Sequence, residues 1–215
     1  MEDDRSILIR RAVLFGVPFL YLVLGLFHPT SNPEVGDETG LFIGVHVAQL
    51  FLIGGLAYAL WLLVDGIDSR AARVARALIL PFAIAYTTLD AILGLAWGIV
   101  AQKANELAVA DRAAAGRLLD ELLKDDPFGY ALYWGAGLLW LAAALTVVIA
   151  LRKSAPRSAL VLMGLGATVF AVGHSQPMGP IGMGLLIAGL AWLELRPRRE
   201  ARSERGSVAL TGTGG

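Results

Sequence analysis

Long apolar stretches separated by short polar segments dominate this chain. A helix needs about 20 apolar residues to cross a hydrocarbon core about 30 Å thick, and each of these stretches has about 17–25. Membrane β-strands would alternate apolar and polar residues over about ten positions, which these stretches do not. The pattern predicts an all-α, polytopic membrane helix bundle with six transmembrane helices, at residues 12–27, 41–64, 77–101, 130–151, 158–174 and 178–195.

The polar segment between the third and fourth stretches has its own helical pattern, in "NELAVADRAAAGRLLDELLKDDP". Its apolar residues fall near one helical face, with charges opposite: Leu107, Ala114, Leu118, Leu122 and Leu123. Pro127 should end the helix. We therefore expect an amphipathic helix within residues 102–126 on the outer face of the bundle. It would act as a packed surface helix, a lid over a site, or a docking surface for a protein partner.

No change in composition divides residues 1–198, so we expect one transmembrane domain there. Residues 199–215 are polar and rich in Gly and Thr, which predicts a disordered cytoplasmic tail. The first apolar stretch lacks a small-residue cleavage site after it, and we interpret it as a retained span. Small residues recur within the stretches, for example Gly94 and Gly98, as is typical of closely packed membrane helices.

Basic residues are concentrated in alternate connecting segments. Most of the 18 Lys and Arg residues lie before the first stretch, after the second, after the fourth or after the sixth. Because positive residues near span ends favour the cytoplasmic side, both termini should be cytoplasmic and three connections should face outward. The excess of Arg over Lys and the abundance of Ala and Gly indicate a GC-rich bacterial genome. These features predict a multi-pass protein of the bacterial inner (plasma) membrane, with the lipid bilayer as its surroundings.

Composition excludes several classes of chemistry. The formal net charge is zero and gives no indication of a nucleic-acid partner. The chain has no Cys, which excludes disulfides, thiolate catalysis and Cys-ligated metal centres. Histidines and carboxylates remain as the strong metal ligands.

The chain has only three histidines, and the predicted topology places all of them on the outer side. His28 ends the first span and His174 ends the fifth, next to prolines. His46 lies about five residues into the second span, or about 8 Å below the outer edge. Gln49 shares a helical face with it. Each histidine alone also fits a structural role, at the membrane interface, at a helix end or in a buried hydrogen bond.

Asp90 is the one acidic residue deep inside a span. It lies about 20 Å along the third span, roughly 10 Å below the outer edge and close to the expected depth of His46. An ionised carboxylate there is costly without a partner, so it marks a functional site by default. The alternative is a structural hydrogen bond to a neighbouring Thr, Tyr or backbone group. Glu34, Asp37 and Glu38 lie above this layer on the first outer connection.

We hypothesise that His46, Asp90 and at least one further histidine share a polar pocket. His28, His46, His174 and Asp90 are then candidate ligands of Zn, Cu or non-haem Fe. Two facing imidazoles could instead hold a b-type haem. His46 and Asp90 are also a candidate catalytic acid–base pair. The spacing does not select among these, since the chain lacks HExxH and CxxCH motifs.

Three functions fit the sequence. The first is an outward-facing site in the outer leaflet half that binds a metal or haem or acts on a lipophilic or periplasmic substrate. The second is a non-catalytic accessory or scaffold subunit, favoured by the small size, the glycine-rich helix faces and the amphipathic segment. The third is a small transporter, which the single deep charge and the lack of matching broken helices disfavour. Whether the protein is an enzyme is left open by the sequence.

Overall fold

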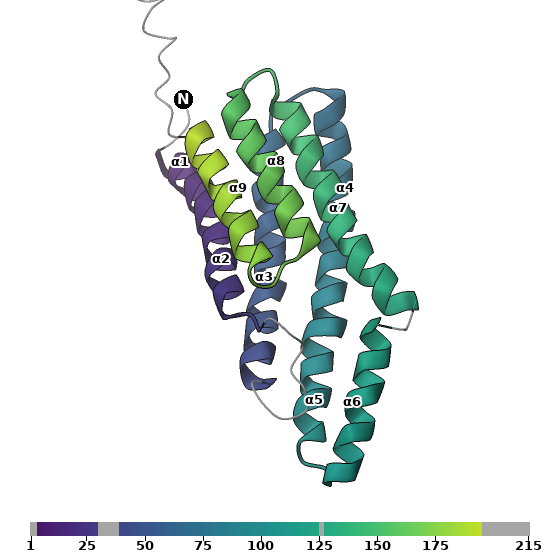
Figure 1. Ribbon diagram of the computed structural model, residues 1–215. Coiled ribbons are helices and arrows are strands. Elements are labelled where there is room, and N and C mark those ends of the chain that lie inside the picture. The colour runs from purple at the N-terminus through teal and green to yellow at the C-terminus, as the bar shows by residue number, and fades with distance from the viewer. Residues whose placement is uncertain (1–3, 30–38, 125–126, 195–215) are drawn as a thin grey trace, which may run out of the picture.

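The computed structural model describes residues 4–29, 39–124 and 127–194, and these residues form helices and turns without a strand (Figure 1). The first continuous helix consists of α1 (Asp4–Arg11), the π-helical segment η1 (Ala12–Gly16) and α2 (Val17–Phe27). After α3 (Thr39–Val64), a second composite helix consists of α4 (Arg70–Leu89), the π-helical η2 (Asp90–Ala96) and α5 (Trp97–Ala104). The remaining helices are α6 (Val109–Lys124), α7 (Pro127–Leu151), α8 (Arg157–Val172) and α9 (Met178–Glu194).

Four helices are long and apolar enough to cross a membrane, namely Arg5–Phe27, Thr39–Val64, Arg70–Ala104 and Pro127–Leu151. The helices expected at 158–174 and 178–195 are present as α8 and α9, which are apolar but have only 16 and 17 residues. At 1.5 Å per residue they are about 25 Å long, somewhat shorter than a typical span. The protein is therefore all-helical with four candidate membrane-spanning helices and a shorter apolar hairpin.

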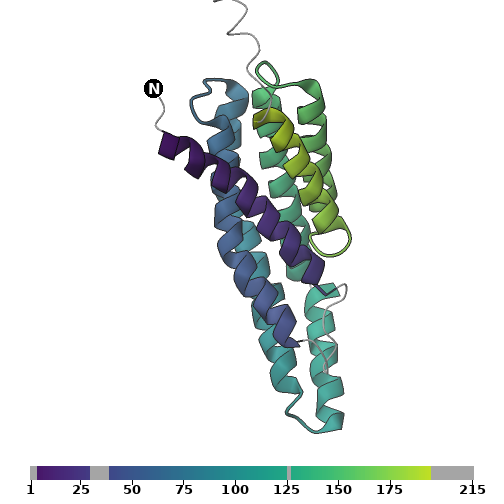
Figure 2. The same ribbon diagram turned by 90° about the vertical axis from the view of Figure 1, so that its left-hand side faces the viewer.

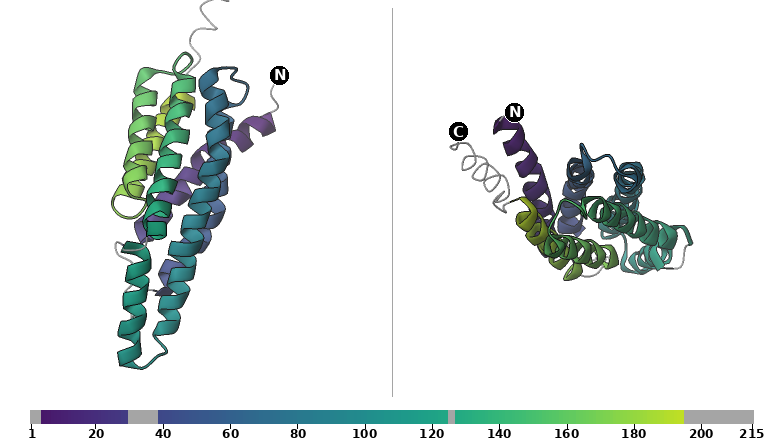
Figure 3. Two further views of the ribbon diagram at one scale, coloured as in Figure 1. Left: turned by 90° about the vertical axis from the view of Figure 1, so that its right-hand side faces the viewer. Right: turned by 90° about the horizontal axis from the view of Figure 1, so that it is seen from above.

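The apolar helices pack in a closed circuit. Each of α2, α3, α4, α7, α8 and α9 contacts the next, and α9 returns to α2. The first helix crosses the bundle obliquely (Figure 2). The α5–α6 hairpin extends beyond the level of the α8–α9 turn, at the end opposite the start of α1 (Figures 1 and 3). Trp140 lies in the core, fully buried, and its indole N–H donates to the Ala167 carbonyl at 3.0 Å.

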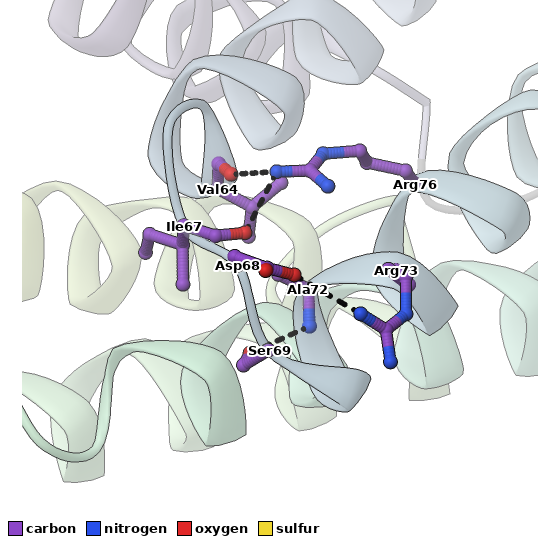
Figure 4. A network of polar contacts seen from close by, with 7 residues as sticks. All are labelled: Val64, Ile67, Asp68, Ser69, Ala72, Arg73 and Arg76. Atoms are coloured by element: carbon purple, nitrogen blue, oxygen red, sulfur yellow. Dashed lines mark hydrogen bonds and ion pairs between the residues drawn. The ribbon is translucent and has the colours of Figure 1, made fainter.

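The turn between α3 and α4 is held by a compact polar network (Figure 4). Arg76 donates to the carbonyls of Val64 and Ile67 at 2.7 and 2.9 Å, which satisfies acceptors at the end of α3. Ser69 caps α4 by accepting from the amide of Ala72 at 3.1 Å. Gly66, at φ 70°, supplies the left-handed residue after the helix. The arginines expected to mark the cytoplasmic side therefore also stabilise this turn.

The amphipathic segment forms α6, and the leucine that it buries, Leu119, is not one of the five residues expected on its apolar face. Leu118 is 67% exposed and Leu107 is 45% exposed, whereas Leu119 is buried. The reason is that α6 packs against α5 and α7, and this contact selects the face through Leu119. Ala114 is also exposed. The side chains of Leu122 and Leu123 lie outside the described part of the structure, as do Glu34, Asp37, Glu38 and the segment 199–215.

Candidate metal centre

The three histidines converge from three separate segments of the chain. His28 directly follows α2, His46 lies on α3, and His174 lies in the turn between α8 and α9. One ligand nitrogen from each can be chosen so that all three lie within 4.8 Å of one another. The ring centroid of His28 lies 4.9 Å from that of His46 and 5.3 Å from that of His174. We refer to these three residues as the histidine cluster.

Local features place two of these residues at helix ends. Pro29 disfavours helical geometry at the preceding residue, and His28 accordingly has φ −68° and ψ 125°, which ends α2. Gly173 is extended and ends α8 directly before His174. The Gln176 side chain donates to the Leu26 carbonyl and so joins the turn after α8 to the end of α2. These contacts bring His174 alongside His28.

Hydrogen bonds indicate the tautomers of two imidazoles. Nδ1 of His28 lies 2.8 Å from the Pro29 carbonyl, and Nδ1 of His46 lies 2.8 Å from the Phe42 carbonyl. Because a carbonyl only accepts, each Nδ1 carries the proton and donates it. The lone pair is then on Nε2, and in His28 this atom is buried and has no hydrogen-bond partner among the residues that the structure describes. Metal-ligating histidines in general also donate the N–H of the second ring nitrogen, commonly to a backbone carbonyl, and this bond orients the ring.

Electrostatics also favour the neutral, ligating form of the imidazole. Burial lowers the pKa of His28 below its ordinary value. Burial, with the nearby His28 and His46, lowers the pKa of His174 to about 3. Both rings are consequently uncharged near pH 7, and a neutral imidazole is the form that binds a metal ion.

Two glycines set the position of α3 against the composite helix α4–η2–α5. A β-carbon at Gly94 would overlap Cδ2 of His46, and one at Gly98 would lie 2.9 Å from Cδ1 of Phe42. Phe42 is one helical turn before His46, and Gly98 is one turn after Gly94, so the two helices run antiparallel in this register. Aromatic contacts continue outward from His46 and Phe42. Phe42 packs on Trp97, and the indole N–H of Trp97 donates to the Leu119 carbonyl of α6 at 3.2 Å.

Asp90 is not one of the converging ligand groups. It lies one turn before Gly94, so the register places it about 6 Å deeper than His46 rather than at the same depth. Asp90 is 1% exposed, and neither carboxylate oxygen has a hydrogen-bond partner among the described residues. Tyr21 and Tyr86 interact electrostatically with it. Gln49, one turn inward from His46, is fully buried at the corresponding depth of α3.

Sequence reasoning missed several residues that shape this region. Tyr86 lies four residues before Asp90, so helical spacing alone could have flagged it as a neighbour on one face. Gly94, four residues after Asp90, was identified only as a close-packing position and not as a neighbour of the site. Tyr86 also contacts the histidine cluster, with its ring centroid 5.9 Å from that of His174. Tyr21 comes from α2, and no local pattern connects it to Asp90.

Comparison with known proteins adds no further assignment, since no protein-family model, curated protein or solved structure matches this chain.

Proposed function

We propose that this protein is a membrane-embedded metal-binding protein whose histidine cluster holds one first-row transition metal ion near the outer end of a six-span bundle. The observation that carries the proposal is the convergence of the only three histidines in the chain, from segments far apart in sequence. Two of the three, His28 and His46, are buried, so the cluster is part of the packed interior.

The donor set favours Zn²⁺ or a copper ion. A tetrahedral ion with Zn–N distances of 2.0–2.1 Å requires ligand nitrogens about 3.3 Å apart. The nitrogens of the histidine cluster lie within 4.8 Å of one another, so small ring movements would bring them to this spacing. Three imidazoles leave a fourth position for water or a substrate, as in catalytic rather than structural zinc sites. Bound there, the metal would supply Lewis acidity and activate water.

A b-type haem fits the geometry less well. Two axial imidazoles would have to lie on opposite sides of the iron, with ring centroids about 6 Å apart and a porphyrin between them. His28 and His46 have centroids 4.9 Å apart and an interplanar angle of 67°, and His174 packs on the same His28 ring. Convergence of three rings on one point supports an ion in place of a macrocycle.

The membrane orientation is part of the proposal. We place α8 and α9 across the membrane as the fifth and sixth spans, with both termini in the cytoplasm. The basic segments at the start of α1, before α4 and before α8 support this orientation. The histidine cluster and α6 would then be in the outer half of the structure, accessible to an extracytoplasmic or lipophilic substrate.

Metal content of the purified protein tests the proposal. The protein is purified in detergent, and its Zn, Cu and Fe are quantified by elemental analysis before and after chelation and reloading. We expect one ion per chain, with affinity reduced at least about 100-fold in His28→Ala, His46→Ala and His174→Ala. Thr168→Ala, on the exposed side of α8, is the matched control and should retain the ion. Equal metal content in wild type and all three histidine variants would disprove the proposal.

An accessory subunit is the second candidate, supported by the apolar surface of the α5–α6 hairpin. Leu107, Val109 and Leu118 are 45%, 80% and 67% exposed. Replacing Val109 and Leu118 by Glu should leave the metal content unchanged. If this surface binds a protein partner, the same replacement should remove the partner from the complex observed by native mass spectrometry, whereas unchanged complexes would argue against an accessory role.

A further inference from the structure

Four polar side chains are buried inside the bundle near the histidine cluster, and the α3–η2 register places two of them, Asp90 and Gln49, one helical turn deeper than His46. We call Tyr21, Gln49, Tyr86 and Asp90 the deep polar cluster, and none of them is more than 3% exposed. They come from α2, α3, α4 and the first residue of η2. Both phenols interact electrostatically with the Asp90 carboxylate, and the α3–η2 register places Gln49 at the depth of Asp90.

Most of the polar atoms of this cluster have no hydrogen-bond partner among the described residues. These atoms are both carboxylate oxygens of Asp90 and both amide atoms of Gln49. Inside a bilayer no bulk water compensates such groups, and each unpaired one is costly. Their accumulation in one buried region therefore indicates a ligand. The available donors are carboxylate, amide and phenol oxygens, which suit hard cations and not the metals preferred by imidazole.

The charge around Asp90 determines the class of cation. Arg10, Arg73 and Lys103 form ion pairs with carboxylates other than Asp90, and Asp90 has no ion pair with a described residue. On its own helix, the nearest cationic residues on either side are Arg76 and Lys103, each about 20 Å away along the axis. One carboxylate is neutralised by one positive charge, whereas a divalent ion would leave an excess charge in a low-dielectric region.

We propose that the deep polar cluster binds one monovalent metal cation, Na⁺ or K⁺, through Asp90 with the neutral oxygens of Gln49, Tyr21 and Tyr86. The backbone at this point is consistent with an ion site, because the helix changes from α to π at Asp90. π-helical segments are frequent at functional sites, and irregular helix segments contribute to Na⁺ binding in membrane transporters. This site is separate from the histidine cluster in both residues and ligand chemistry.

Binding of radioactive ²²Na⁺ to the purified full-length protein tests this inference, with choline chloride keeping the ionic strength constant. We expect saturable binding of one Na⁺ per chain, displaced by unlabelled Na⁺ or K⁺. The affinity should fall at least about tenfold in Asp90→Asn and in Gln49→Leu, since each removes an oxygen ligand. Asp65→Asn, an exposed carboxylate after α3, is the control and should bind as wild type does.

The histidine variants separate this result from the proposed metal centre. His46→Ala should lose zinc and keep ²²Na⁺, so the two proposals can fail independently. Size-exclusion chromatography verifies that each variant is folded. Where a variant does not fold, binding of ²²Na⁺ to the wild-type protein still tests the inference. Absence of saturable wild-type binding displaced by Na⁺ or K⁺ would overturn the inference. An unchanged affinity for Na⁺ in Asp90→Asn would overturn it as well. Loss of zinc without loss of Na⁺ in Asp90→Asn or Gln49→Leu would have the same consequence.

Discussion

At the scale of single residues, the absence of a side chain is as important as the histidines themselves. Gly94 allows the His46 ring to lie directly against the backbone of η2, because a β-carbon there would overlap the ring. The carbonyl of Phe42 fixes the other side of the ring by accepting from its Nδ1. His46 is therefore held between a backbone acceptor on α3 and a glycine on η2.

Gly94→Ala should weaken metal binding at the histidine cluster by about tenfold or more, because the His46 ring must move away from its ligating position. Ala is otherwise favoured over Gly within a helix by about 1 kcal/mol, so the effect should come from the ring displacement and not from loss of helix. Gly54→Ala is the matched control, since a β-carbon there would meet nothing within 4 Å. Zinc titration by calorimetry compares the two, and equal affinities would contradict this account of Gly94.

At the scale of elements, the α8–α9 hairpin is built on close backbone contact. A β-carbon at Gly182 would lie 2.7 Å from the Phe170 amide nitrogen and 2.9 Å from the Gly166 carbonyl. Small residues allow membrane helices to approach in this way and to gain van der Waals contact. The turn that joins these helices carries His174, so their spacing also determines the position of the third imidazole.

Gly182→Ala should force α8 and α9 apart, lower the free energy of unfolding by about 1–3 kcal/mol and weaken metal binding. Gly184→Ala, two residues along the same helix, would meet only Cδ1 of Leu22 at 3.7 Å and should be tolerated. Thermal unfolding followed by tryptophan fluorescence, together with zinc titration, measures both effects. A Gly182→Ala protein as stable as Gly184→Ala would show that the close approach is not required.

Trp97 connects the α5–α6 hairpin to the rings around the histidine cluster. Trp97→Phe should retain an aromatic contact with Phe42 but remove the hydrogen bond to the Leu119 carbonyl. Loss of a buried hydrogen bond costs about 1 kcal/mol, so amide hydrogen exchange in α6 should become about fivefold faster. Trp134→Phe, at a residue 42% exposed on α7, is the control. Unchanged exchange in α6 would mean that the bond does not hold the helix in place.

The helices were largely predictable because each apolar stretch is long and continuous. The predicted segment 41–64 corresponds to α3, Thr39–Val64, and 130–151 corresponds to α7, Pro127–Leu151. The apolar pattern of α6 did not identify Leu119 as its buried leucine, since the pattern does not determine which neighbours the helix packs against. Tertiary contact with α5 and α7 decided that Leu119 and not Leu118 is buried.

The candidate site was predictable in its residues but not in its arrangement. Topology placed His28, His46 and His174 at one end, and the structure brings them together. The relative depth of Asp90 depends on the register between α3 and η2, which Gly94 sets through packing and which no sequence periodicity encodes. The contribution of Tyr21 depends in the same way on how α2 packs beside the bundle.

At the scale of the whole molecule, charge distinguishes the two ends. The start of α1, the α3–α4 and α7–α8 turns and the end of α9 lie at one end (Figure 1). There Arg10 forms an ion pair with Glu194 at 3.0 Å, which joins the first and last apolar helices. The histidine cluster lies toward the other end, beyond which the α5–α6 hairpin projects. In the proposed orientation, a metal ion supplied from outside the cell would reach the proposed metal centre without crossing the bundle.

Cysteine labelling tests this orientation, because the native chain has no cysteine and gives no background. Single substitutions Asp68→Cys, Asp111→Cys and Met178→Cys place a thiol in the α3–α4 turn, on α6 and at the α8–α9 turn. A membrane-impermeant maleimide should label Asp111→Cys and Met178→Cys in intact cells, and Asp68→Cys only after permeabilisation, as expected if basic segments stay cytoplasmic. All three positions are exposed in the structure, so packing within the protein would not prevent their reaction. Labelling of Asp111→Cys without Met178→Cys would mean that α8 and α9 do not cross the membrane, despite their apolar composition, and would leave a four-span protein.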